Sequence, residues 1–289
     1  MDKLSSVLET FRPTATLVDC YAVPSSSLLV LSTDACYWFY LVEGQLEILT
    51  SQSDKRRRNE QDSLLLNSGD GLWLPSGQDI TLRRLSEKAC LLRCDYTFGS
   101  KQLNPLLDSQ SQWIKVTKGD NVATYLAPMT ALLLQENLDP HCGSKVVVAR
   151  LAEAYLIQLL RFFLQFYIIN VGLMAGLSDD KLAKAIVAMH DAPDKDWQVS
   201  SLAAEAGMSR SGFSSHFKQT LNMTPMGYLT SWRMRLAGQR LINGEHNLAI
   251  LSQTLGYQSE AAFRRTFKKY MGIAPGAMLR ESKRTALNH

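Results

Sequence analysis

An internal repeat occupies the last third of this 289-residue chain and strongly restricts its fold. Gly207 and Gly256 are 49 residues apart, whereas Phe217 and Phe267 are 50 apart, so the second copy has one extra residue after its glycine. The segment is therefore expected to form two similar units in tandem.

Each copy predicts two helices joined by a tight turn. The glycine allows the positive φ that ends the first helix, and Ser209 or Ser259 stands where the second helix needs an N-cap. Phenylalanines four residues apart then attach the second helix to a core. They are Phe213 and Phe217 in the first copy, and Phe263 and Phe267 in the second. The pattern is typical of helix-turn-helix units.

The opposite face of each second helix is polar or small. Its residues are Arg210, Ser211, Ser214, Ser215 and Lys218 in the first copy, and Glu260, Ala261, Arg264, Arg265 and Lys268 in the second. A short helix with such a face can enter the major groove of double-stranded DNA. Residues 178–289 carry a net charge of +6, against −2 for residues 1–177, which favours a nucleic-acid-binding module. The alternative is a helical bundle that does not bind DNA.

The segment between the copies, Pro225–Ile242, predicts one continuous helix, because proline suits a first helical turn. A helix of about 16 residues is roughly 24 Å long. That length can hold the two units about one DNA turn apart, roughly 34 Å, in adjacent major grooves. Arg233, Arg235 and Arg240 are then expected to reach phosphates.

The first hundred residues predict β-structure. Short apolar runs, such as Cys36–Val42 and Ala89–Cys94, are separated by turn signals, which is typical of a sandwich or small barrel. Gly69, Pro75 and Gly77 resemble the second motif of cupin barrels. Metal-binding cupins have a histidine at a fixed distance after this motif, where Ile80 stands here. We therefore expect no metal and no cofactor, although a metal-dependent cupin enzyme remains an alternative.

A long helix is predicted over Val146–Asn170, which contains no Pro or Gly. It is apolar over most of its circumference, so it is either buried in the core or covered by a second subunit of a homodimer. Charged and amide residues interrupt the apolar stretch up to Leu177, which argues against a membrane span.

The two copies and the helix between them share many residues with a known family. These are Leu202, Ala203, Gly207, Met208, Ser209, Phe213 and Phe217, then Pro225, Tyr228, Leu229, Trp232, Arg233, Met234 and Ala237, then Leu255, Gly256, Tyr257, Phe263, Phe267, Lys268, Gly272 and Pro275. Through them, residues 179–281 resemble the DNA-binding domain of AraC/XylS-type bacterial transcription regulators. The resemblance implies a cytoplasmic regulator, either an activator or a repressor, that binds promoter DNA, contacts RNA polymerase and has no enzymatic activity.

The resemblance also implies which positions read bases. They are Ser211, Ser214 and Ser215 in the first copy, and Glu260, Ala261, Arg264 and Arg265 in the second. Serine reads bases weakly, whereas arginine binds guanine with two hydrogen bonds, so we expect the second copy to discriminate more. The expected fold class is α+β, with a cupin-like barrel and flanking helices over 1–177 and an all-α domain over 178–289.

The five cysteines have no disulfide-framework spacing, which indicates free thiols in a reducing cytosol. Arg93 lies between Cys90 and Cys94, and basic neighbours favour the reactive thiolate. The cupin-type regulators that this chain resembles include oxidant-responsive members, which implies Cys20, expected before the first clear strand, and Cys94 as the redox pair. Cys90 is a third candidate. The alternatives are inert buried thiols, a small-molecule effector held in the barrel, or an adaptor that senses no signal.

Overall fold

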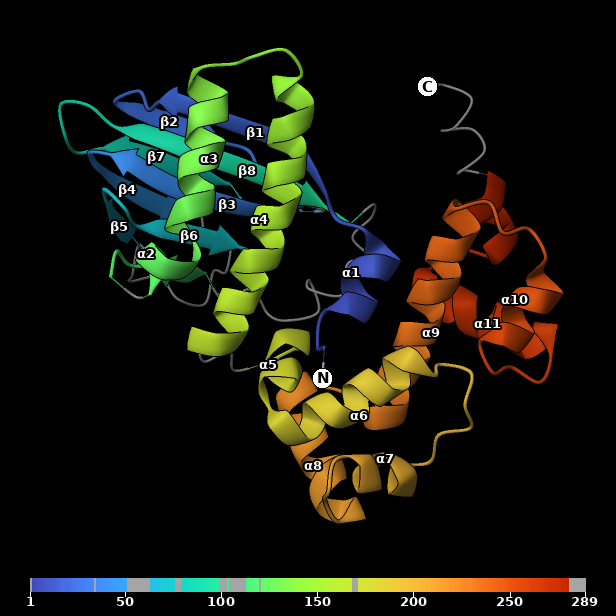
Figure 1. Ribbon diagram of the computed structural model, residues 1–289. Helices are drawn as coiled ribbons and strands as arrows, with labels where there is room; N and C mark the ends of the chain where they lie inside the picture. The colour runs from blue at the N-terminus through green and yellow to red at the C-terminus, as the bar shows by residue number, and fades with distance from the viewer. Residues whose placement is uncertain are drawn as a thin grey trace. The chain divides into compact units, whose positions relative to one another are not determined.

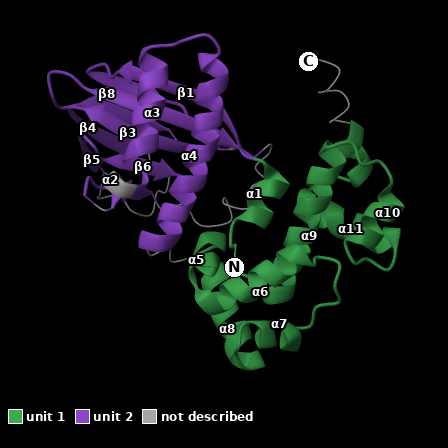
Figure 2. Cartoon of the chain, viewed as in Figure 1, with its two compact units in different colours: residues 1–12, 169–289 green, residues 13–168 purple. Residues whose placement is uncertain are grey.

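The computed structural model describes residues 2–33, 35–50, 63–75, 79–98, 103, 113–119, 121–167 and 171–280. The chain divides into a sheet unit, residues 13–168, and a helical unit, residues 1–12 with 169–289 (Figure 2). The sequence placed a boundary between 177 and 178. The structure differs because α5 (Leu173–Ser178) packs against α6 (Asp180–Asp191) in the helical unit.

In the described residues, the sheet unit contains two antiparallel sheets (Figure 1). One has the strand order β1-β8-β3-β6-β9 and the other β2-β7-β4-β5. The strands are β1 (Thr14–Ala22), β2 (Ser26–Leu29), β3 (Ala35–Glu43), β4 (Gln45–Thr50), β5 (Ser63–Asn67), β6 (Gly71–Leu74), β7 (Ile80–Arg84), β8 (Cys90–Thr97) and β9 (Ile114–Val116). Many short strands in two sheets confirm the expected cupin-like sheet domain.

The core of the sheet unit follows from the alternation of side chains along each strand. Tyr37, Phe39 and Leu41 of β3 belong to the apolar cluster that also contains Ile48 of the other sheet. Trp38 points to the opposite face, where its ring centroid lies 6.3 Å from that of Tyr155. Strand β3, in the middle of the five-stranded sheet, is therefore buried on both faces.

Two helices, α3 (Ala127–Leu138) and α4 (Ser144–Phe166), cover the outer face of the five-stranded sheet (Figure 1), and the short helix α2 (Val122–Tyr125) precedes them. Phe163 of α4 packs against Trp73, with ring centroids 5.8 Å apart. The middle of the predicted long helix is thus buried in the core. Val146, at the start of α4, is 66% exposed, so the core does not account for the whole apolar surface.

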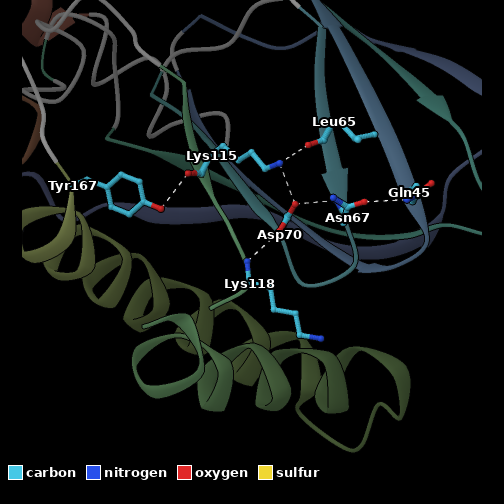
Figure 3. Close-up of polar contacts among 7 residues, drawn as sticks. All are labelled: Gln45, Leu65, Asn67, Asp70, Lys115, Lys118 and Tyr167. Carbon is cyan, nitrogen blue, oxygen red and sulfur yellow. Dashed lines mark hydrogen bonds and ion pairs between the residues drawn. The ribbon is translucent and has the colours of Figure 1, made fainter. Parts of the chain in front are cut away.

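Asp70 fastens the turn between β5 and β6 to β9 (Figure 3). Its carboxylate accepts hydrogen bonds from the backbone N–H of Asn67 (3.0 Å) and Lys118 (3.1 Å), and lies 3.2 Å from the Lys115 ammonium. Burial by itself would raise the pKa of Asp70, but these hydrogen bonds and the Lys115 charge outweigh it, so the pKa is lowered. The carboxylate is therefore a structural anchor of the sheet.

Replacing Asp70 with alanine is expected to lower the free energy of unfolding of the sheet unit by about 2–3 kcal/mol. The two N–H groups and the ammonium would lose their common acceptor. Since the folded pKa is lowered, this stabilisation is present above the usual aspartate pKa and is lost as pH falls through the folded value. Urea unfolding of the full chain measures the effect, and the exposed Glu87→Ala change should cost less than about 0.5 kcal/mol. Equal losses for both variants would contradict the prediction.

The helical unit contains the predicted tandem repeat. After α5 and α6 follow α7 (Val199–Glu205), α8 (Arg210–Leu221), α9 (Pro225–Ile242), α10 (Leu248–Thr254) and α11 (Glu260–Met271). Both turn glycines have positive φ, 62° at Gly207 and 78° at Gly256. Ser209 and Ser259 accept N-cap hydrogen bonds from backbone N–H groups of α8 and α11. The local structure predicted from the repeat is confirmed.

The N-terminal helix α1 (Ser5–Phe11) belongs to the helical unit, although its residues are far away in sequence. Phe11 is 2% exposed, and its ring centroid lies 5.4 Å from that of Trp232 in α9. The Trp232 ring stacks on His190 of α6 at 3.6 Å, and the Ser6 hydroxyl lies 3.0 Å from His190 Nδ1. Burial lowers the pKa of His190 to about 3, so the imidazole is neutral at physiological pH.

Candidate DNA interface and thiol cluster

The first candidate reading helix, α8, has one buried and one exposed side. Phe213 and Phe217 are fully buried. Four of the five predicted contact residues are exposed: Arg210, Ser211, Ser215 and Lys218. Ser214 is half-buried, and its hydroxyl donates to the Arg210 carbonyl at 3.0 Å within the same helix. The exposed side of α8 therefore offers small hydroxyls between two cations.

The second candidate reading helix, α11, repeats this division with a more strongly charged surface. Phe263 and Phe267 are fully buried, while Ala261, Arg264, Arg265 and Lys268 are exposed. Glu260 is half-buried and pairs with the Arg264 guanidinium, with its Oε1 2.6 Å from Nε and 2.5 Å from Nη2. Arg264 thus has a carboxylate partner before any DNA arrives.

The connecting helix α9 carries the three arginines that are expected to reach phosphates. The Arg233 guanidinium donates to the carbonyls of Pro193 (2.5 Å) and Lys195 (3.0 Å), so it is held against the segment between α6 and α7. Arg235 is only 8% exposed. Arg240 donates to the Thr254 hydroxyl at 2.9 Å. The structure therefore gives these side chains protein partners or burial, and their contacts with phosphates stay predictions.

The cysteines of β1 and β8 lie on one face of the paired strands. Val18 pairs with Cys94, Cys20 with Leu92, and Ala22 with Cys90. Cys20 thus lies within β1, in contrast to the expectation that it precedes the first strand. Its Sγ is 3.3 Å from that of Cys90, so the structure brings Cys20 next to Cys90, whereas the expected redox pair was Cys20 and Cys94.

The thiols lack the basic neighbour that the sequence implied. Arg93 forms two 2.6 Å hydrogen bonds to the Asp95 carboxylate, and alternation along β8 directs both to the face opposite the cysteines. Burial, followed by its contact with Cys90, raises the pKa of Cys20 to about 12. Burial also raises the pKa of Cys94 to about 12. Neither thiol is activated as a thiolate at neutral pH.

Two further properties concern the described residues alone. Among them, no three His, Cys, Asp or Glu side chains are grouped in a way that could hold a metal ion. None of the helices described is both long and apolar enough to cross a membrane.

Two protein families match this chain. The helix-turn-helix domain family matches residues 202–281, and the cupin family matches residues 2–165. A putative AraC-like transcription regulator of Streptomyces lividans is 29% identical over 237 residues, which cover 82% of this chain and 78% of the relative. The chain belongs to the AraC family of transcription regulators. Both expectations from resemblance, the AraC-type DNA-binding domain and the cupin domain, are confirmed.

Two other relatives of this AraC-family chain match different shares of its length. An uncharacterised helix-turn-helix transcriptional regulator of Haemophilus influenzae is 35% identical over 53% of this chain and 51% of its own length. The "RCS-specific HTH-type transcriptional activator RclR" of Escherichia coli is 22% identical over 79% of this chain and 81% of its own length. The relatives are thus named as regulators of transcription, not as enzymes.

Sequence reasoning missed three features of this AraC-family chain. It did not predict the packing of α1 on α9, the hydrogen bonds of Arg233 to Pro193 and Lys195, or the contact between Cys20 and Cys90. A hydrophobic spacing was present for α1, since Leu4, Val7 and Phe11 recur every three or four residues. For the other two, the partners are distant in sequence, and no local pattern identifies them.

Proposed function

We propose that this AraC-family regulator binds double-stranded DNA with α8 and α11 in adjacent major grooves, and that α11 reads most of the base sequence. The observation that carries the proposal is the division of α11 into a buried phenylalanine seam and an exposed face with Arg264, Arg265 and Lys268. Arginine can bind guanine with two hydrogen bonds, whereas the serines of α8 discriminate weakly. Arg210, Lys218 and Lys268 supply the sequence-independent attraction to phosphates.

Selection of bound duplexes from a random pool by the full-length protein tests this function. The expected product contains two short motifs whose centres are about 10–10.5 base pairs apart, because two helices on one face of the duplex meet adjacent grooves. The motif bound by α11 should carry the greater base preference. A pool that stays random, or that yields one motif alone, would contradict the proposal.

The signal proposed for the sheet unit is oxidation of Cys20 and Cys90 to a disulfide. Their sulfur atoms are 3.3 Å apart, and one relative is named as RCS-specific. With hypochlorous acid as oxidant, both S–H bonds break and one S–S bond forms. The chlorine accepts the two electrons and leaves as chloride, with water and one proton released.

Thiol labelling before and after mild hypochlorite treatment tests this signal. Wild type and Cys94→Ala are expected to lose two labelled thiols and gain one disulfide, whereas Cys20→Ser and Cys90→Ser form none. Retention of both thiols in wild type, or a disulfide that contains Cys94, would overturn the pairing. If the disulfide forms without any change in DNA affinity, the adaptor alternative is favoured. A small-molecule effector, a homodimer and contact with RNA polymerase stay predictions.

A further inference from the structure

Arg233 lies near the middle of α9, the helix that joins the two helix-turn-helix units. Its Nε donates to the Pro193 carbonyl at 2.5 Å, and its Nη2 donates to the Lys195 carbonyl at 3.0 Å. Both carbonyls belong to the segment between α6 and α7, which leads into the first unit. A half-buried guanidinium that donates two such bonds holds this segment against α9.

The same side chain also contacts the second unit. The Arg233 guanidinium carbon lies 5.9 Å from the ring centroid of Tyr257, in the turn between α10 and α11. The Tyr257 ring in turn packs edge-on against Phe263 of α11, with centroids 5.7 Å apart. One side chain therefore touches the lead-in to the first unit and an aromatic ring that packs on the second reading helix.

The backbone of the second turn approaches the first unit at the same place. A Cβ built on Gly256 would lie 2.5 Å from the Asp194 carbonyl oxygen and 2.9 Å from Arg233 Nη2. A glycine is thus needed at this position for close approach as well as for its positive φ of 78°. Arg233, Tyr257 and Gly256 form one contact, here called the clamp, between the two units.

We propose that Arg233 is a positioning residue that sets the distance and rotation between α8 and α11, and hence the separation of DNA subsites that the protein accepts. This inference rests on the proposed function, in which both helices enter grooves of one duplex. Both units also contact α9 directly, through α8 and through α11. Without the clamp, the second unit can rotate about α9, and one base pair of added separation already turns a subsite by about 35°. Loss of Arg233 should therefore weaken the preference for one subsite separation, without abolishing the contact of α8 and α11 with DNA.

The test uses the full-length protein and duplexes that carry the two selected subsites at the preferred separation or moved apart by one to three base pairs. Wild type is expected to favour the preferred separation by about tenfold. Arg233→Met should reduce that preference to about threefold or less, while its affinity for a single subsite changes by less than about twofold. Arg233→Lys should restore part of the preference, since an ammonium can donate to a carbonyl but lacks the planar fork that stacks on Tyr257.

Arg240→Met is the matched control, because it removes the same charge from the same helix. It should keep the wild-type preference for the selected separation, so any change in affinity should be the same at every separation. Tyr257→Leu removes the other half of the clamp, so it should relax the preference even if Arg233→Met does not fold. If Arg233→Met folds and keeps the wild-type preference for separation, the role of Arg233 is overturned but the proposed DNA-binding function is not. A wild type that binds all separations equally would overturn the proposed function as well.

Discussion

Replacement of Arg265 by alanine is expected to weaken specific DNA binding by about 1–3 kcal/mol, or roughly 5- to 150-fold. Arg265 is exposed on α11, between the fully buried Phe263 and Phe267. A guanidinium in this position can form two hydrogen bonds with the edge of a guanine. Removing the side chain leaves that base edge unpaired, which costs about 1–3 kcal/mol of binding free energy. The change leaves the buried seam intact, so the helix itself should stay folded.

Ser215→Ala is the matched control for Arg265→Ala. The two positions are 50 residues apart and equivalent in the repeat, and both are exposed. Because serine reads bases weakly, its loss should cost less than about 1 kcal/mol. Titration of the selected duplex and of an unrelated duplex, at two salt concentrations, separates base reading from phosphate attraction. An unchanged affinity ratio between the two duplexes in Arg265→Ala would contradict the prediction.

Arg264 is expected to contribute less than Arg265, although the two are neighbours in sequence. Its guanidinium already binds the Glu260 carboxylate. Release from an exposed pair costs about 0.3–0.5 kcal/mol, so Arg264 can still turn to DNA. The carboxylate left behind then faces the negatively charged duplex, which favours only those sequences that offer Glu260 a hydrogen-bond donor, such as cytosine N4.

The helical unit could be predicted in detail because its signals are local. Gly207, Ser209 and Phe213 are within seven residues of one another, and each determines backbone or packing near itself. The contact between Cys20 and Cys90, in contrast, could not be predicted from local sequence signals. Cys90 and Cys94 are each two residues from Leu92, the partner of Cys20, so both are diagonal neighbours across the strands. The pattern does not distinguish the two diagonals, because the twist of the sheet decides which one is short.

The same limit applies to Arg233 and to α1. An arginine on a helix in a basic segment predicts phosphate contact, and only the fold shows that the carbonyls of Pro193 and Lys195 lie within its reach. The first twelve residues carry an apolar spacing, but nothing in it indicates that the partner is Trp232, more than two hundred residues away. Contacts between distant segments depend on the whole packing arrangement rather than on the pattern of either segment.

Phe11→Ala is expected to destabilise the helical unit by about 3–4 kcal/mol, because it removes a fully buried ring and leaves a cavity beside Trp232. Trp232 also stacks on the uncharged His190, so the cavity adjoins a polar group that burial keeps neutral. Water that enters there would favour protonation of the imidazole and weaken the stack further. Hydrogen exchange of the α6 and α9 amides in the full-length protein measures the stability of this unit.

The exposed Glu9→Ala change in the same helix is the control and should cost less than about 0.5 kcal/mol. Exchange in Phe11→Ala no faster than in Glu9→Ala would show that α1 adds little to the stability of the helical unit.

The packing of α1 on α9 is also expected to affect DNA binding. A fragment that begins near residue 179 lacks α1 and leaves Trp232 without Phe11, so it should bind the selected duplex more weakly than the full chain. Addition of a peptide with residues 1–12 should then recover part of that affinity, because it returns the missing ring to the same cavity.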